Sequence, residues 1–98
     1  MSAYLIVDIE VRDTAAYEEY KGEVPRLVAK HGGKYLVRGG PHEVIEGTWK
    51  PSRLVLFRFP SRRAIRDFVE DPEYASLKAL RQRVASSNMV AVEGIEQT

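Results

Sequence analysis

Cysteine is absent from the sequence, and this absence excludes disulfide bonds, thiolate nucleophiles and thiolate metal ligands. Histidine is scarce, because the chain has only His31 and His42, and these two show none of the short spacings that pairs of metal ligands use. No serine stands in the G-x-S-x-G pattern of hydrolases with a serine-based triad. We therefore expect no metal site, no cofactor and no triad hydrolysis.

Charge of one sign and long apolar runs are lacking as well. The chain has 15 lysines and arginines against 14 aspartates and glutamates, so its formal net charge is +1 and no strong field directs it toward nucleic acid or an anionic membrane. The longest apolar run is only a few residues, and residues 1–11 lack the basic flank and long apolar centre of a secretion signal. We expect a cytoplasmic protein with neither nucleic acid nor a membrane as partner.

The first third of the chain predicts a strand followed by a helix. Residues 3–11 alternate between two faces, one of them wholly apolar, which is typical of a strand. Asp13 can cap a helix on which apolar residues recur at helical spacing until two glycines end it. Pro25 lies inside this helix and removes a backbone donor, so we expect a kink or break over residues 22–25.

The rest of the chain predicts three further strands and a second helical region. The strands are expected at 35–38, 53–59 and 89–92, with a short extended arm at 42–47. Ser61 can cap a helix that restarts at Asp71 and Pro72. The order β-α-β-β-α-β predicts an α+β, ferredoxin-like fold over residues 1–98, a single domain in which the helices cover one face of an antiparallel sheet.

The face of the sheet away from the helices is also expected to be apolar. The residues that indicate this are Ile6, Leu36, Leu54 or Val55, and Val90 or Ala91. Two helical segments cover only one face of such a sheet, and an uncovered apolar face usually marks an association surface. We therefore predict a homodimer in which two copies pack sheet against sheet.

Arg81 is a candidate functional residue because its side chain is expected to point from the helix toward the core. On a helical wheel it lies between Tyr74 and Val84, which belong to the apolar face. A buried guanidinium without a partner is costly, so Arg81 must find a carboxylate, backbone carbonyls or a bound anion. Two interpretations stay open. One is a structural role, in which Arg81 pairs with Glu46 or Asp8 or extends its guanidinium to the edge of the core, and the other is contact with a ligand.

A second group of polar candidates lies between the second and third strands. Arg38, Gly39 and Gly40 could surround an anion with one guanidinium and two backbone amides. A glycine turn beside a solvated arginine would have the same sequence. Glu46, which precedes a glycine in the short arm, could act as a general base if it were desolvated, or it could simply pair with an arginine.

Several stretches of the sequence together resemble one protein family. They are Tyr17 and Tyr20 with Pro25, GGKYLVRGG at 32–40, EVIEG at 43–47, Trp49, Pro51, Arg53, Phe59-Pro60, PEY at 72–74, and Arg81. Over nearly its whole length the chain resembles the domain-of-unknown-function family 1330 (DUF1330), within the dimeric α+β barrel superfamily. The resemblance implies two ferredoxin-like subunits joined through their sheets, with a cleft in each subunit between helices and sheet. It implies no agreed reaction.

The chain departs from the family's pattern at two positions. Arg58 stands where the family usually has an acidic residue, and Val69 where it often has an aromatic one. A role for that acidic residue therefore does not carry over. Haem-degrading members of the superfamily use a helix histidine and a strand asparagine, and no matching pair is found here. Quinone-forming monooxygenases resemble the chain in fold only.

Three functions are compatible with these residues. The first is a cofactor-independent enzyme acting on a small anionic or carbonyl metabolite, in which Arg81 and Arg38 bind the anion, Glu46 moves a proton, and Tyr74 and Trp49 shape the pocket. The second is a non-catalytic dimeric module that binds a metabolite or a partner protein. The third is a purely structural dimer in which Arg81 and Glu46 pair. The sequence does not decide between enzyme and binder.

Overall fold

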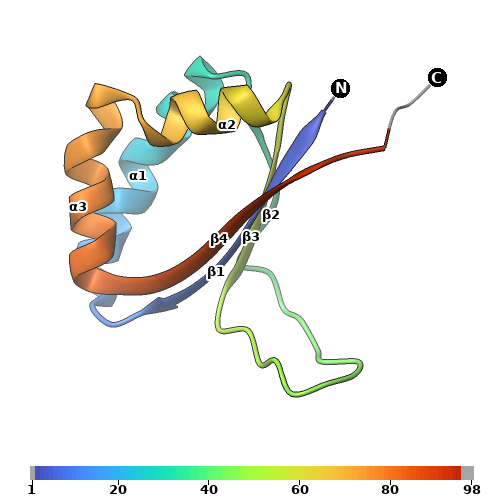
Figure 1. Ribbon diagram of the computed structural model, residues 1–98. Coiled ribbons are helices and arrows are strands. Elements are labelled where there is room, and N and C mark those ends of the chain that lie inside the picture. Colours follow the sequence, from blue (N-terminus) through green and yellow to red (C-terminus); the bar gives the residue numbers. More distant parts are fainter. Residues whose placement is uncertain (1, 96–98) are drawn as a thin grey trace.

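The computed structural model describes residues 2–95, and the elements follow one another in the predicted order. They are β1 (Ala3–Val11), α1 (Thr14–Lys30), β2 (Lys34–Arg38), β3 (Leu54–Phe59), α2 (Arg62–Val69), a short 3₁₀ turn η1 (Pro72–Tyr74), α3 (Ala75–Val84) and β4 (Ala85–Glu93). The strands form an antiparallel sheet in the order β2-β3-β1-β4. The helices lie together on one face of this sheet (Figure 1). The predicted α+β, ferredoxin-like fold is confirmed.

The hydrophobic core lies between the helices and the inner face of the sheet. The alternation predicted for β1 is observed, since Leu5, Val7 and Ile9 are buried beneath the helices. The neighbouring strand β3 adds Phe57 and Phe59 to the same core. Within residues 2–95, no helix combines the length and the apolar character needed to cross a bilayer.

The first helix, α1, continues through Pro25, so the predicted break is not observed. Its start is as predicted, because the Asp13 carboxylate accepts a hydrogen bond from the amide of Ala16 at 3.1 Å. Pro25 has no N–H and cannot satisfy the carbonyl of Lys21 one turn earlier. The guanidinium of Arg38, on β2, donates to that carbonyl at 2.7 Å instead. A side chain from the edge strand therefore completes the helix where the proline leaves an acceptor free.

The edge strand β2 contains a bulge that decides which of its side chains face the helices. Tyr35 and Val37 pair with adjacent residues of β3, so Leu36 is the extra residue of the bulge. In a regular strand Tyr35 and Arg38, three positions apart, would point to opposite faces. The bulge brings both side chains to the inner face, where the Arg38 guanidinium carbon lies 4.6 Å from the centre of the Tyr35 ring.

The second helical region begins and restarts at the predicted residues. The hydroxyl of Ser61 accepts a hydrogen bond from the amide of Ala64 at 3.0 Å and caps α2. The carboxylate of Asp71 accepts from the amide of Glu73 at 2.8 Å, at the start of η1. After the restart, α3 packs against α1. Arg81 lies on α3 and is buried.

Within residues 2–95 no helix covers the outer face of the sheet (Figure 1). The centre of this face is apolar. The central row across the four strands consists of Val37, Leu56, Ile6 and Val90. Leu54 lies on the same face, because it pairs with Asp8. Leu54 and Val90 are therefore the outward members of the two pairs of alternatives that the sequence left open, while Val55 is buried in the core.

Residues 39–53 connect β2 to β3 as a long loop that extends beyond the sheet (Figure 1). The predicted extended arm belongs to this loop and forms no strand, and every residue from 41 to 50 is exposed. Two hydrogen bonds attach the loop to the outer face of the sheet. Both end on the carboxylate of Asp8, which accepts from the indole of Trp49 at 3.0 Å and from the amide of Ser52 at 2.9 Å.

Candidate functional site

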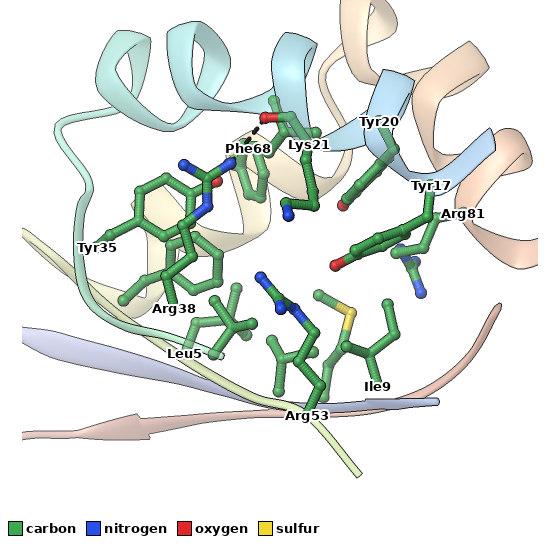
Figure 2. Close-up of a pocket in the computed structure, with 15 residues that line it drawn as sticks. Leu5, Ile9, Tyr17, Tyr20, Lys21, Tyr35, Arg38, Arg53, Phe68 and Arg81 are labelled. Atoms are coloured by element: carbon green, nitrogen blue, oxygen red, sulfur yellow. Dashed lines mark hydrogen bonds between the residues drawn. The ribbon is translucent and has the colours of Figure 1, made fainter. Parts of the chain in front are cut away.

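A narrow cavity lies between α1 and the inner face of the sheet (Figure 2). Most of its wall is apolar or aromatic, and the residues of this kind are Leu5, Val7, Ile9, Tyr17, Tyr20, Val24, Tyr35, Val55, Phe57, Phe68 and Met89. About 30 Å³ of the interior is free for water-sized molecules, which is room for roughly two waters. A wider hollow of about 380 Å³ opens at the mouth, lined by Glu18, Lys21, Gly22, Arg38 and Arg53.

Four cationic side chains line the cavity, and no carboxylate does so among the residues that the structure describes. The cations are Lys21, Arg38, Arg53 and Arg81. The acid at the mouth is Glu18, whose carboxylate lies 3.3 Å from the Lys21 amine in a pair that is largely exposed. Because the cavity wall is apolar, the positive charges act through a medium of low dielectric constant, which strengthens their attraction for an anion.

Arg38 lines the cavity and its mouth, but its neighbouring glycines do not form the predicted turn around an anion. The amide of Gly39 donates to the carbonyl of Leu54 at 2.8 Å and is therefore used within the sheet. Gly40 is exposed, and no residue lies within 4 Å of where its side chain would be. The predicted pair of free amides around an anion is not formed. Gly39 instead provides space, because a side chain there would overlap the guanidinium of Arg53.

Arg53 belongs to the residues that carry the family resemblance, but the sequence reasoning did not name it as a site residue. Its guanidinium carbon lies 5.8 Å from the centre of the Tyr17 ring, and its Nε atom is buried without a hydrogen-bond partner in the described part of the chain. The guanidinium of Arg53 is therefore incompletely satisfied in the described part of the chain. The sequence could have indicated this position, because alternate residues of a strand face the same side. Continued back to residue 53, the alternation of β3 places Arg53 on the same side as the buried Val55 and Phe57.

Arg81 is buried as predicted, with only 6% of its surface exposed. Its Nε donates to the hydroxyl of Tyr74 at 3.3 Å, and its Nη1 donates to the hydroxyl of Ser87. Neither of the carboxylates considered as partners lies beside it: Glu46 is in the exposed loop, and Asp8 is on the other face of the sheet. Within residues 2–95 the guanidinium of Arg81 forms no ion pair with a carboxylate.

The structure does not bring Glu46 or Trp49 to the cavity. Glu46 is exposed in the loop over residues 39–53, and it does not line the cavity or its mouth. Trp49, 60% exposed, lies over the outer face of the sheet next to Asp8. In a loop, no repeating pattern in the sequence indicates which way a side chain points. The sequence therefore could not show that Glu46 and Trp49 lie away from Arg38 and Arg81.

Tyr74 has no exposed surface and does not itself line the cavity. Its hydroxyl lies 2.7 Å from the hydroxyl of Tyr20, which is part of the cavity wall. Burial is the largest cause that raises the pKa of Tyr20, and the interaction with Tyr74 raises it further. The pKa of Tyr35, on the opposite wall, is also raised, mainly by burial. Both phenols therefore keep their protons at neutral pH, so they donate hydrogen bonds and do not act as bases.

Fold and site together define a ferredoxin-like α+β protein with a cationic cavity between its first helix and its sheet. Residues 2–95 match the family described as domain of unknown function DUF1330, and the chain belongs to that family. A comparison with curated proteins finds no match.

Solved structures with this fold come from several bacteria. A protein of unknown function from Rhodopseudomonas palustris is 17% identical, with a TM-score of 0.78 over 98% of this chain and 84% of that one. SnoaB, described as a cofactor-independent oxygenase from Streptomyces nogalater, is 10% identical, with a TM-score of 0.67 over 98% and 95% of the two chains. A dimeric protein of unknown function with a ferredoxin-like fold from Bacteroides fragilis is 16% identical, with a TM-score of 0.65 over 95% and 96%. At these identities the likeness shows the fold alone.

Proposed function

We propose that the cavity binds a small organic anion with a short apolar body. The observation that carries the proposal is the set of four cationic side chains around an apolar cavity whose described lining contains no carboxylate. Two of these cations are incompletely satisfied, since Arg53 has a buried Nε without a partner and Arg81 has no carboxylate beside it. A buried guanidinium without a counter-charge is unfavourable, and a bound anion removes part of that cost.

The shape of the cavity sets the orientation of the ligand. Lys21, Arg38 and Arg53 line both the interior and the wider mouth, so the anionic group belongs between them. The narrow interior beyond them is lined by rings such as Phe57 and Phe68 and suits a short apolar body. A planar carboxylate matches the forked donors of the two arginines. Short carboxylic acids are therefore favoured over inorganic phosphate, which has no apolar part.

A thermal-shift screen of short carboxylic acids and inorganic phosphate tests the proposal. At about 100 times its dissociation constant, a ligand stabilises the folded protein by ~2.7 kcal/mol, which raises the melting temperature measurably. We expect Arg53→Gln to lose most of this shift. The matched control is Arg63→Gln, which removes an arginine whose side chain is 83% exposed on α2, and it should keep the shift. The proposal is wrong if no acid stabilises the wild type, or if Arg53→Gln responds equally.

A second candidate function is that the bound anion reacts in the cavity without a cofactor. It is supported by the shared fold with SnoaB, which is described as a cofactor-independent oxygenase. Cations placed around a reacting molecule stabilise negative charge that develops on it, so Lys21 and the three arginines would favour an anionic intermediate. Incubation of a stabilising acid with the protein in air, followed by mass spectrometry, tests this. If the acid is converted by the wild type but not by Arg53→Gln, catalysis is supported. If the acid is recovered unchanged, the protein does not catalyse its conversion and only the proposed binding function stands.

We also propose that two copies of the chain associate through the outer faces of their sheets. The apolar row that includes Ile6, Leu56 and Val90 lies on a face that no helix within residues 2–95 covers. A relative with the same fold, from Bacteroides fragilis, is described as dimeric. Packing sheet against sheet would remove this apolar surface from water, and it leaves the cavity free because the cavity lies on the other side of the sheet.

A further inference from the structure

A buried chain of hydrogen bonds leads from Arg81 to the cavity wall. A guanidinium can only donate, and the Nε of Arg81 donates to the hydroxyl of Tyr74 at 3.3 Å. The hydroxyl of Tyr74 lies 2.7 Å from that of Tyr20. Tyr74 is wholly buried, whereas Tyr20 lines the cavity. These hydrogen bonds therefore connect a buried cation to a hydroxyl at the surface of the cavity.

The direction of the bond between the two tyrosines follows from the surroundings of Tyr74. The oxygen of Tyr74 already accepts from Arg81, and its own proton needs an acceptor. In the described part of the chain, the oxygen of Tyr20 is the acceptor within reach. If Tyr20 donated instead, the proton of Tyr74 would be buried without an acceptor, which is unfavourable. Tyr74 therefore donates to Tyr20, and the proton of Tyr20 is left for the cavity.

The hydroxyl of Tyr20 faces the same space as the cationic groups at the mouth. Figure 2 shows it directed toward the region into which the Lys21 amine and the Arg53 guanidinium also point. The hydrogen bond from Arg81 to Tyr74 polarises the next one, from Tyr74 to Tyr20, so the positive charge of Arg81 strengthens Tyr20 as a donor. Burial raises the pKa of Tyr20, which keeps the donated proton on the phenol. The cavity thus offers a strong neutral donor next to its cations.

We infer that Tyr20 donates a hydrogen bond to a carbonyl oxygen of the bound anion, so that the preferred ligands are short 2-oxo acids rather than simple carboxylic acids. The inference rests on the proposed function, because the carboxylate of the ligand lies between Lys21, Arg38 and Arg53. The 2-oxo oxygen is adjacent to that carboxylate and accepts from Tyr20. Tyr74 is a positioning residue that acts through Tyr20, and Arg81, which itself lines the cavity, also polarises Tyr20 through Tyr74.

A pair of ligands that differ only at carbon 2, which is a carbonyl in one and a methylene in the other, tests the inference. We would measure the dissociation constants of 2-oxobutanoate and butanoate by NMR titration, at a pH at which both acids are ionised. We expect the wild-type protein to bind 2-oxobutanoate about tenfold more tightly, which corresponds to about 1.4 kcal/mol for one additional hydrogen bond. This preference is measured without any substitution, so it tests the inference even if a variant fails to fold.

Three variants locate the donor. Tyr20→Phe should reduce the affinity for 2-oxobutanoate to that for butanoate, while the affinity for butanoate changes by less than about twofold. Tyr74→Phe should reduce the preference partly, because it removes the connection to Arg81. A purely structural role of Tyr74 would change the melting temperature without changing the ratio of the two affinities. The matched control is Tyr4→Phe, which removes a hydroxyl from the outer face of the sheet and should leave both affinities unchanged.

The possible outcomes separate this inference from the proposed function. If neither acid binds, the anion site itself is wrong. If both acids bind equally and Arg53→Gln weakens both, the anion site is supported and the role of Tyr20 is overturned. If Tyr17→Phe removes the preference while Tyr20→Phe keeps it, the donor is the neighbouring hydroxyl and the inference is also overturned. A preference that is lost in Tyr20→Phe alone, and reduced in Tyr74→Phe, supports it.

Discussion

At the scale of single residues, two adjacent glycines at the end of β2 show how local geometry supports the cavity. Gly39 has a φ of +73° and leaves space for the guanidinium of Arg53, whereas Gly40 has open space around it. We expect Gly39→Ala to destabilise the fold by about 1–2 kcal/mol, because alanine is strained at this φ. It should also weaken anion binding, because the new methyl group displaces Arg53. Gly40→Ala should be nearly neutral in both respects.

Urea denaturation and ligand titration of the two alanine variants check this prediction. Equal stabilities of the two variants would contradict the strain argument. If Gly39→Ala is destabilised but binds the ligand with unchanged affinity, then the position of Arg53 does not depend on the space beside Gly39.

The sequence predicted single residues well only where a periodic element fixed their direction. The inward position of Arg81 follows from the helical spacing of α3, and the structure confirms that it is buried. Arg53 was predictable in the same way, from the alternation of β3. Arg38 has an inner-face position that depends on the bulge at Leu36, which the sequence does not reveal. Glu46 lies in a long loop, where no period indicates which way a side chain points.

At the scale of elements, Pro25 and Arg38 connect α1 to the edge strand. Pro25 leaves the carbonyl of Lys21 without a helical donor, and Arg38 donates to it at 2.7 Å. We expect Pro25→Ala to raise the free energy of unfolding by about 1–2 kcal/mol, because the helical penalty of proline exceeds the entropy that it removes from the unfolded chain. The restored amide would compete with Arg38 for the carbonyl, so the affinity for an anion should fall a few-fold.

Chemical denaturation and ligand titration measure the two effects of Pro25→Ala separately. Glu19→Ala, at an exposed position of the same helix, is the control and should change the affinity little. If Pro25→Ala gains stability without losing affinity, Arg38 does not need the Lys21 carbonyl to hold its binding position.

The end of α1 is held to the start of η1 by charges around Asp71. Its carboxylate accepts from Lys30 at 2.9 Å, from His31 at 2.7 Å and from the amide of Glu73 at 2.8 Å. These bonds, the one from Lys30 first, lower the pKa of Asp71 far below its usual range. In the unfolded chain an aspartate has a pKa of about 3.9. When the pH falls below this value, the carboxylate is protonated in the unfolded state but not in the folded state, and this difference lowers the free energy of unfolding.

We expect Asp71→Asn to be less stable than the wild type at pH 7 and to lose less stability between pH 7 and pH 3. Urea denaturation at several pH values measures both effects. Asp67→Asn, which removes an exposed carboxylate paired with Arg63 on α2, is the control and should keep the wild-type pH dependence. Parallel curves for Asp71→Asn and the wild type would show that this carboxylate does not link folding to pH.

At the scale of the whole molecule, the order and layering of elements were predictable because they depend on many residues at once. The strand alternation of residues 3–11 and the caps at Asp13, Ser61 and Asp71 all agree with the observed fold. A local feature, such as the continuity of α1 through Pro25 where a kink or break was predicted, does not alter the topology. The cavity was less predictable because it depends on how side chains from α1, β2, β3 and α3 meet, and only a packed structure shows that.

The proposed dimer is the property of the whole molecule that one substitution can test. Ile6 lies at the centre of the outer face, between Leu56 on β3 and Val90 on β4. We expect Ile6→Glu to dissociate the dimer, because each copy would bury an unpaired carboxylate at the interface, at a cost of several kcal/mol. The monomer should stay folded, because this side chain points away from the core. Glu19→Lys, on the exposed side of α1, is the charge control and should leave the dimer intact. Sedimentation equilibrium at micromolar concentration measures the assembly, and a monomeric wild-type protein would refute the sheet-to-sheet dimer.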